Sequence, residues 1–240
     1  MHTQRRLGRC ARIYLMPKRI IHFLRPSKTV PVTPWTATSR WSLTPMRVLI
    51  LWFGLAIFGL GDALIIQSTL GNAPWSVLAQ GISKHSPLSL GWSTLVIGFL
   101  VLLGWIPLKQ QPGFGTISNI LIISYALQIG TDVFPIQHHT LWIRFAYVIL
   151  GIIIIGIGSS LYITCGLGPG PRDGLMTGIH RVTGVRVGRV RLFIEVIALS
   201  IGWLLGGRVG IGTLLFALLI GNSVAISLGV VRKLTTSEQV

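Results

Sequence analysis

Two stretches of this chain repeat each other at a separation of 97 residues. Residues 47–124 align with residues 144–221 without a gap, and 23 of the 78 aligned pairs are identical. An apolar composition alone would match leucine with leucine, but it would not keep glycine and proline in step over this length. The chain therefore contains two copies of one unit, an architecture typical of secondary transporters. The identical pairs include Arg47/Arg144, Gly54/Gly151, Gly59/Gly156, Gly61/Gly158, Leu70/Leu167, Gly71/Gly168, Pro74/Pro171, Gly81/Gly178, Gly91/Gly188, Gly113/Gly210 and Thr116/Thr213.

The composition indicates that much of the surface faces something other than water. Hydrophobic residues make up 51% of the chain and charged residues 11%, whereas a soluble domain carries about 25% charged residues. The 21 basic residues outnumber the five acidic ones, but nine of the 21 precede position 46 and the others flank apolar segments. Basic residues in such places orient membrane helices. We therefore expect a lipid bilayer as the partner, and no nucleic acid.

The chemical inventory gives no sign of catalysis. The two cysteines, Cys10 and Cys165, lie far apart in sequence, and His138, His139 and His180 form no ligand set with cysteines or acids nearby. We find no nucleophile with an adjacent base. We therefore expect no metal, no cofactor and no catalytic residue, and a protein that is not an enzyme.

Residues 1–45 form a basic, proline-containing segment without an apolar run long enough to span a membrane. Three interpretations fit this composition: a disordered cytoplasmic tail near anionic lipid, an organelle-targeting peptide, or a start-site artefact with translation beginning at Met16 or Met46.

Six apolar segments follow, each close to the ~20 residues with which a helix crosses a bilayer. After the first and the fourth of them, a glycine-rich turn and a proline lead into a helix of about 10–12 residues, which is too short to cross alone. We interpret both short helices as re-entrant or interfacial, because irregular backbone at membrane depth survives only against protein or a wet cavity. The six segments are residues 47–66, 90–107, 115–134, 141–163, 190–206 and 211–230.

Three crossings per copy would turn the second copy upside down relative to the first. The sequence thus predicts an all-α integral membrane protein with six transmembrane helices and two short re-entrant helices, arranged as two inverted-topology repeats. The first repeat is residues 46–134, the second is residues 141–230, and residues 231–240 form a cytoplasmic tail.

The positive-inside rule does not decide the number of spans. If the N-terminal tail lies in the cytoplasm, eight of the basic residues after Arg47 lie on the cytoplasmic side and three on the outer side. An alternative with eight spans and parallel repeats gives the same tally, so only helix length favours six. Both alternatives put both termini in the cytoplasm.

The candidate binding residues lie at the two glycine-proline turns. A helix that begins at Pro171 offers free N–H groups and a positive dipole end, and Arg172 adds a guanidinium group, so an anionic group could bind there. The alternative is a plain cytoplasmic helix start, capped by Asp173. The candidate substrate-binding residues are Pro74 and Trp75 from the first copy, and Gly168, Pro171, Arg172 and Asp173 from the second.

Asp62 and Glu195 are the only acidic residues inside the six segments. An ionisable group at such depth is a functional hypothesis by default, and both are candidates for proton coupling. The alternative for Glu195 is an ion pair with Arg191, which lies one helical turn earlier. The alternative for Asp62 is a position near the membrane interface.

Several of these motifs resemble the YczE-type bacterial integral membrane proteins, the YczE/YyaS/AitC group. The resemblance covers about residues 46–230 and implies a multi-pass plasma-membrane protein, but it supplies no substrate. Members of that group commonly begin near the first span, and they usually have Asp where this chain has Ser76. The motifs are Leu70-Gly-x-x-Pro-Trp75, Pro107-Leu-x-Gln-x-Pro-Gly-x-Gly-Thr116, Gly168-Pro-Gly-Pro-Arg-Asp-Gly-Leu-Met-Thr-Gly178 and Gly206-Gly-x-x-Gly-x-Gly-Thr213.

The duplication and the short helices favour a secondary transporter or exporter of an unidentified small solute, with an anionic group on that solute. The alternative is a scaffold or assembly partner that transports nothing, acting as a homo-oligomer or with another membrane protein.

Overall fold

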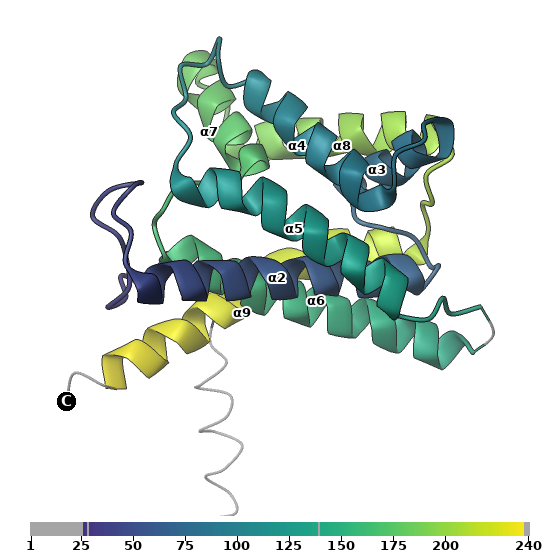
Figure 1. Ribbon diagram of the computed structural model, residues 1–240, viewed down its shortest axis with the longest axis horizontal. Helices are drawn as coiled ribbons and strands as arrows, with labels where there is room; N and C mark the ends of the chain where they lie inside the picture. The colour runs from purple at the N-terminus through teal and green to yellow at the C-terminus, as the bar shows by residue number, and fades with distance from the viewer. Residues whose placement is uncertain (1–25, 28, 139, 238–240) are drawn as a thin grey trace, which may run out of the picture.

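The computed structural model describes residues 26–27, 29–138 and 140–237, and this part of the chain forms eight α-helices and no strand (Figure 1). The all-α prediction is thus confirmed for the described residues. The predictions that concern residues 1–25 and 238–240 lie outside them. The helices are α2 (Pro45–Gln67), α3 (Pro74–His85), α4 (Leu90–Leu103), α5 (Phe114–Val133), α6 (Leu141–Thr164), α7 (Pro171–Thr183), α8 (Val187–Leu204) and α9 (Ile211–Ser237).

Local sequence signals explain where several helices begin and end. Prolines open α2, α3 and α7, because a proline at the first helical position loses no hydrogen bond. The Thr44 side chain accepts a hydrogen bond from the Arg47 N–H and caps α2, and Ser89 caps α4 in the same way. Gly184 ends α7 in a left-handed conformation, with φ of 71°.

Four helices are individually long and apolar enough to cross a membrane: α2, α5, α6 and α9. The α3–α4 pair, bent by 116°, counts as a fifth candidate if it is one broken span. The count stays below the six expected because α4 has 14 residues, or about 21 Å of helix, and α8 carries three charges, Arg189, Arg191 and Glu195. The structure therefore describes a helical membrane protein with four or five candidate spans.

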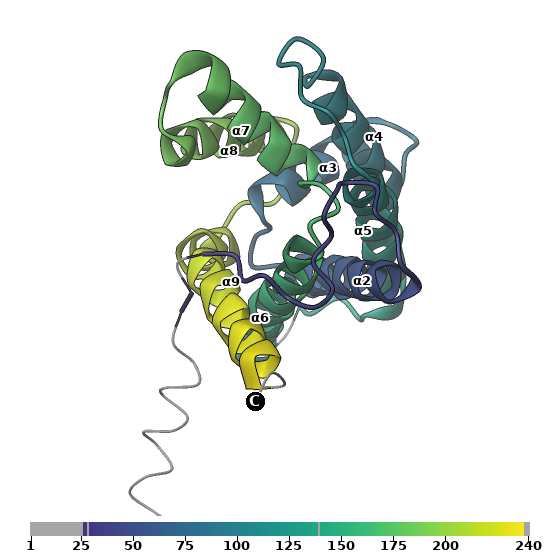
Figure 2. The same ribbon diagram turned by 90° about the vertical axis from the view of Figure 1, so that its left-hand side faces the viewer.

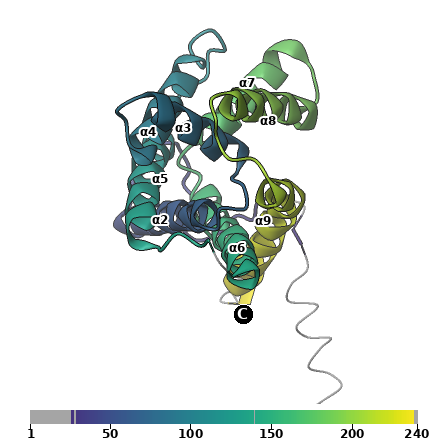
Figure 3. The same ribbon diagram turned by 90° about the vertical axis from the view of Figure 1, so that its right-hand side faces the viewer.

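These helices form two groups. We call α2, α5, α6 and α9 the core group: α2 packs on α6, α5 packs on α2, and α9 packs on α6. We call α3, α4, α7 and α8 the hairpin group, in which α3 packs on α4 and α8 while α7 packs on α4 and α8. Figures 2 and 3 show the core group in the lower part of the molecule and the hairpin group above it.

Glycines bring α2 and α6 together along the middle of the core group. A Cβ atom added to Gly158 would lie 2.5 Å from the Gly54 carbonyl oxygen, and one added to Gly151 would lie 2.6 Å from the Gly61 oxygen. The early part of α2 thus meets the late part of α6, so the two helices run in opposite directions. Because Gly54 is equivalent to Gly151 and Gly61 to Gly158 in the repeat, the contact is reciprocal, as at a two-fold interface.

The two halves also interlock at their glycine turns. The Gly115 N–H, in the first turn of α5, donates to the Leu167 carbonyl oxygen at 2.8 Å. At the equivalent place in the other half, the Gly212 N–H of α9 donates to the Leu70 oxygen at 2.9 Å. Each turn thereby satisfies a helix-end N–H group that has no partner inside its own helix. These bonds explain why Leu-Gly and Gly-x-Gly-Thr recur in both copies.

The turns leave no room for larger residues at their glycines. Gly71 and Gly168 have φ angles of 117° and 118°, a region that favours glycine. A Cβ atom at Gly168 would lie 3.0 Å from Thr116 Oγ1. That hydroxyl accepts from the Gly113 N–H at 3.1 Å and donates to the Pro169 oxygen at 2.7 Å, which joins α5 to the turn before α7.

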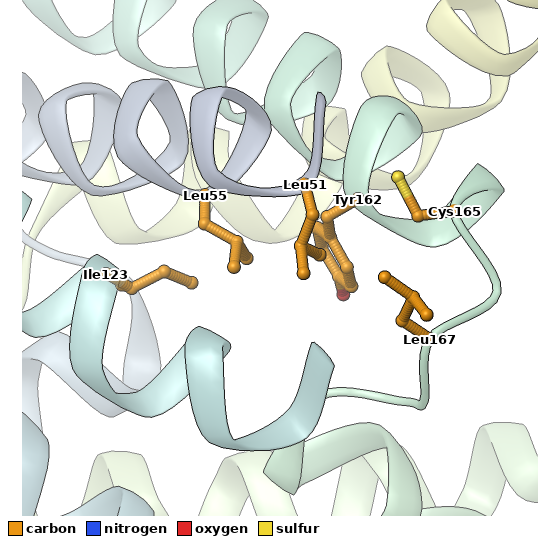
Figure 4. Close-up of a cluster of buried hydrophobic side chains, with 6 residues drawn as sticks. All are labelled: Leu51, Leu55, Ile123, Tyr162, Cys165 and Leu167. Carbon is orange, nitrogen blue, oxygen red and sulfur yellow. The ribbon is translucent and has the colours of Figure 1, made fainter. Parts of the chain in front are cut away.

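Buried apolar side chains fill the space between α2, α5 and the end of α6. Leu51 and Leu55 of α2 meet Ile123 of α5, and Tyr162 closes the cluster from α6 (Figure 4). Cys165 and Leu167, in the turn after α6, complete it. This cluster holds the turn before α7 against the core group, and it therefore fixes where α7 begins.

Part of the N-terminal segment packs on the end of α6. The Thr36 hydroxyl donates to the Thr164 oxygen at 2.9 Å, and the Ala37 N–H donates to the Cys165 oxygen at 2.9 Å. The Trp35 indole N–H donates to Thr164 Oγ1 at 3.1 Å. In the other half, the oxygen of Gln67, which is equivalent to Thr164, accepts from the Gln137 N–H of the linker between α5 and α6, at 2.9 Å. These contacts satisfy carbonyl groups that the ends of α6 and α2 leave free.

We expect Gly158→Ala to lower the stability of the protein. The new methyl group would strike the α2 backbone, and overpacking of this kind costs about 1–3 kcal/mol. Thermal unfolding in detergent, read by size-exclusion fluorescence, should show a melting temperature several degrees lower. Gly221→Ala is the matched control, because nothing lies within 4 Å of a Cβ atom at Gly221; an equal shift in both variants would contradict the close packing.

We expect Thr36→Val to be destabilising as well. It keeps the shape of the side chain but removes the hydroxyl that bonds to Thr164, at a cost of about 1 kcal/mol. Thr38→Val is the control, because Thr38 is exposed. Equal melting temperatures for the two variants in the same detergent assay would show that residues 33–37 contribute nothing to the fold.

Candidate functional site

A cavity of about 280 Å³ lies between the core group and the hairpin group. All eight helices contribute to its wall, which is mostly apolar, and Asn119, Ser124 and Ser159 add polar side chains. Of the six predicted binding residues, five line this cavity: Pro74, Trp75, Pro171, Arg172 and Asp173. The sixth, Gly168, lies in the turn before α7 and lines a neighbouring hollow that Asp173 and Tyr162 share.

Trp75 and Arg172 meet at the centre of the site. The guanidinium carbon of Arg172 lies 4.8 Å from the centre of the Trp75 ring, a cation–π contact. The two residues are separated by 97 positions and are therefore equivalent in the repeat. Because each is the second residue of its short helix, the starts of α3 and α7 face each other across the cavity.

The two short helices present their amino-terminal ends to this centre. Their N-cap residues, Ala73 and Gly170, have no side chain that caps the helix. The first N–H groups of α3 and α7 therefore keep the partial positive charge of a helix start. Two such ends and the Arg172 side chain make the centre of the cavity a favourable place for an anionic group.

Arg172 forms no ion pair with a carboxylate in the described part of the chain. The one ion pair among the described residues joins Arg191 to Glu195, with Nε and Oε1 2.9 Å apart. Asp173 forms no ion pair with Arg172 and does not cap α7, although capping was one of the sequence interpretations. It accepts a hydrogen bond from the Tyr162 hydroxyl at 3.0 Å. The guanidinium group lies over Trp75, close enough to the carboxyl groups of Asp62, Asp173 and Glu195 to interact with their charge. Its N–H groups make no hydrogen bond among the described residues and can donate to a ligand.

Asp62 is buried inside the protein, next to the start of α3 that lines the cavity. The residue is 4% exposed, and its Oδ2 atom accepts a hydrogen bond from the Ser76 hydroxyl at 2.6 Å. Its Oδ1 atom has no hydrogen-bond partner among the described residues. A buried carboxyl group with one free oxygen is a costly arrangement that usually has a functional reason.

The acid and the hydroxyl exchange places between the halves. In the first half the long helix α2 carries Asp62 and the short helix α3 carries Ser76. At the equivalent positions of the second half, α6 carries Ser159 and α7 carries Asp173. Each half therefore has one carboxyl and one hydroxyl group near the centre, in opposite arrangement.

Glu195 lines the cavity from α8, and its carboxylate pairs with Arg191 as one of the two sequence interpretations had it. Its role in proton coupling, like that of Asp62, stays a prediction. The same is true of solute binding by the six candidate residues.

Sequence reasoning missed three polar residues of the site: Ser76 as the partner of Asp62, Tyr162 as the partner of Asp173, and Ser124, whose buried hydroxyl has no partner among the described residues. For Ser76 a signal existed, because it is equivalent to Asp173 in the repeat. Tyr162 and Ser124 stand in apolar runs that look like ordinary core.

Comparison with known proteins agrees with this helical membrane architecture. Residues 45–228 match a family of unknown function (DUF6198). An uncharacterized protein of Haemophilus influenzae is 42% identical over 207 residues, which cover 86% of this chain and 94% of that protein. No solved structure matches the chain.

Two further relatives come from Bacillus subtilis. The uncharacterized membrane protein YczE is 33% identical over 178 residues, covering 73% of this chain and 82% of YczE. The uncharacterized protein YyaS is 27% identical over 195 residues, covering 78% of this chain and 95% of YyaS.

The fold and these matches define a multi-pass helical membrane protein whose relatives have no assigned activity. The chain belongs to the YczE-type family, as its glycine-proline motifs had indicated.

We expect Ser76→Ala to destabilise the protein by about 1–3 kcal/mol, because it removes the hydrogen bond to the buried Asp62 carboxyl group. Ser159→Ala is the matched control, since no residue bonds to that hydroxyl in the described structure. Melting temperatures measured in one detergent should fall only for Ser76→Ala. A fall of the same size in both variants would mean that the Ser76–Asp62 bond contributes nothing specific.

Proposed function

We propose that this protein is a secondary transporter or exporter of a small solute that carries an anionic group. The observation that supports the proposal most directly is the free Arg172 guanidinium group over Trp75, in a cavity between the two halves. A cavity at the interface of two repeats is where transporters of duplicated fold bind their solutes. Apolar side chains such as Ile97, Ile123 and Ile155 would contact the rest of the solute.

The proposed architecture is six spans in two inverted repeats, with α3 and α7 as re-entrant helices. The reciprocal crossings of α2 with α6, and the reciprocal bonds between the glycine turns, support opposite orientations of the halves. Figure 1 supports it further, because α2 and α5 run from left to right whereas α6 and α9 run from right to left. The lengths of α3 and α7, 12 and 13 residues, favour re-entrant helices over full spans.

The proposed location is the bacterial cytoplasmic membrane, with both termini in the cytoplasm. Single cysteines at positions 84, 109, 138 and 186, in a background without Cys10 and Cys165, would test this by labelling with a reagent that does not cross membranes. Six spans require Lys109 to face the cytoplasm and Lys84 to face outward. The reverse pattern would support eight spans.

Asp62 and Glu195 are the proposed sites of proton coupling. Asp62 is buried beside the cavity with one free carboxyl oxygen, so a proton bound there would be close to the solute. Glu195 lines the cavity and forms an ion pair with Arg191. Loading of either acid with a proton during the cycle would link solute movement to the proton gradient.

Flux into proteoliposomes tests the transporter proposal. A panel of radiolabelled small carboxylates and organic phosphates would be measured with and without a proton gradient. We expect Arg172→Ala to reduce the flux of the transported anion by about tenfold or more, since a hydrogen bond to a charged group contributes about 1.5–3 kcal/mol. Arg172→Lys should keep part of the flux, because the charge remains.

Arg181→Ala is the matched control for this assay. It removes the same charge from the same helix, but Arg181 bonds to the Leu108 carbonyl oxygen outside the cavity wall. Unchanged flux in both Arg172→Ala and Asp62→Asn would show that the site is assigned wrongly. Loss of flux in Arg181→Ala as well would point to a general effect of charge.

A non-transporting scaffold is the second candidate. Its support is the large apolar surface of α8 and α9, where Phe193, Trp203 and Leu218 are all exposed and could meet another membrane protein or a second copy. Copurification of one stoichiometric partner, together with no flux for any anion of the panel, would favour the scaffold over the transporter.

A further inference from the structure

The two halves differ most clearly in how their hairpin helices meet the core group. In the first half α4 packs on α5, which joins the hairpin group to the core group. In the second half the equivalent helices are α8 and α9, and they are not packed on each other in this way. Figures 2 and 3 show α8 standing apart from α9, whereas α4 lies directly over α5. We call the two boundaries the α4–α5 seam and the α8–α9 seam.

The α4–α5 seam is closed by small residues on α4. The Gly91 N–H donates to Gln128 Oε1 at 2.9 Å, and a Cβ atom at Gly91 would lie 2.7 Å from the Ser124 carbonyl oxygen. Seven residues further along α4, a Cβ atom at Gly98 would lie 3.6 Å from Ile120 Cβ. The two helices therefore touch along their length.

The equivalent residues of the α8–α9 seam are suited to the same contact but do not make it. Gly188 corresponds to Gly91 and Gly221 to Ser124, and nothing lies within 4 Å of a Cβ atom at either glycine. Glu195 and Ala217 stand at the positions equivalent to Gly98 and Ile120. Gly188 and Gly221 are small enough for the close approach that Gly91 makes, and the open space beside them indicates a second arrangement in which α8 and α9 meet there.

The cavity reaches this open seam. Its wall includes Glu195 and Arg191 from α8, and Ile220 and Gly221 from α9. Packing of α8 on α9 would bring those two walls together. At the α4–α5 seam, by contrast, the packed helices separate the cavity from the outside.

The hairpin group could move as one unit to make this change. On the α8 side, a Cβ atom at Gly202 would lie 2.4 Å from the Leu78 backbone nitrogen of α3, so α3 and α8 are packed tightly. On the α4 side, the Trp105 indole N–H donates to the Pro171 oxygen of α7 at 2.9 Å. Because α3 and α7 each pack on both α4 and α8, these contacts connect α8 with α4.

We propose that the α4–α5 and α8–α9 seams are the two gates of the cavity, and that the hairpin group rocks on the core group so that they close in turn. The structure holds the state in which the α4–α5 gate is closed and the α8–α9 gate is open. This inference rests on the proposed function, because it gives the solute its route in and out.

Disulfide trapping tests the gates without any knowledge of the solute. The full chain would carry Cys10→Ser and Cys165→Ser, with either Gly98→Cys and Ile120→Cys or the equivalent Glu195→Cys and Ala217→Cys. In the first pair the two Cβ atoms would lie 3.6 Å apart, within the range of about 3.5–4.5 Å found in disulfides. Membrane vesicles would be oxidised with copper phenanthroline, and the bond detected by mass spectrometry.

We expect both pairs to cross-link, the first quickly and the second more slowly. A cross-link in the first pair with none in the second would overturn the proposal, provided that Gly188→Cys with Ala225→Cys also forms none. That further pair leaves Glu195 intact, and nothing lies within 4 Å of a Cβ atom at Gly188, so it separates a missing gate from a misfolded variant.

Flux distinguishes failure of the gates from failure of transport. For an anion found to be transported, the disulfide between Gly188→Cys and Ala225→Cys should stop flux and a reductant should restore it, because this pair keeps Glu195 in place. Full flux in protein locked at that pair would overturn the gates and leave the transporter proposal standing. Cross-linking of both pairs with no flux for any anion would support the rocking motion and contradict transport.

Discussion

The reciprocal bonds between the glycine turns are the interaction on which the rest of the structure depends. A helix that starts at membrane depth leaves N–H groups that lipid cannot satisfy. Here Gly115 and Gly212 each find the carbonyl group of a leucine in the opposite half. The same two turns aim α3 and α7 at the centre of the molecule. Without this interlock, Trp75 and Arg172 would not meet, and the cavity would have no polar centre.

Much of the fold could be predicted from the sequence because its signals are local. The proline at the start of α7 and the glycine at its end set the boundaries of that helix whatever the surroundings. Apolar length identified α2, α5, α6 and α9 as candidate spans. The repeat showed which residues of the two halves are equivalent. It therefore directed attention to the two glycine-proline turns as candidate binding sites. The number of spans was less accessible, because α4 is short and α8 is charged.

The polar contacts of the site were harder to predict because they join residues distant in sequence. Ser76 and Asp62 lie on different helices, 14 residues apart, and only the tertiary structure brings the Ser76 hydroxyl to 2.6 Å from the Asp62 carboxyl group. The open α8–α9 seam could not be predicted either. Gly188 and Gly91 look alike in sequence, yet one is packed and the other is not. Sequence specifies the surfaces that can pack, and the conformational state decides which of them do.

The exchange of residue types between the halves has a consequence for recognition. A cavity between two identical halves would offer the same groups to a solute and to that solute turned end over end. Here an aromatic ring and a cation occupy equivalent places, as do a hydroxyl and a carboxyl group. Because the two copies have diverged, the cavity can distinguish the two orientations of a solute. A solute that binds there would need chemically different groups at its two ends.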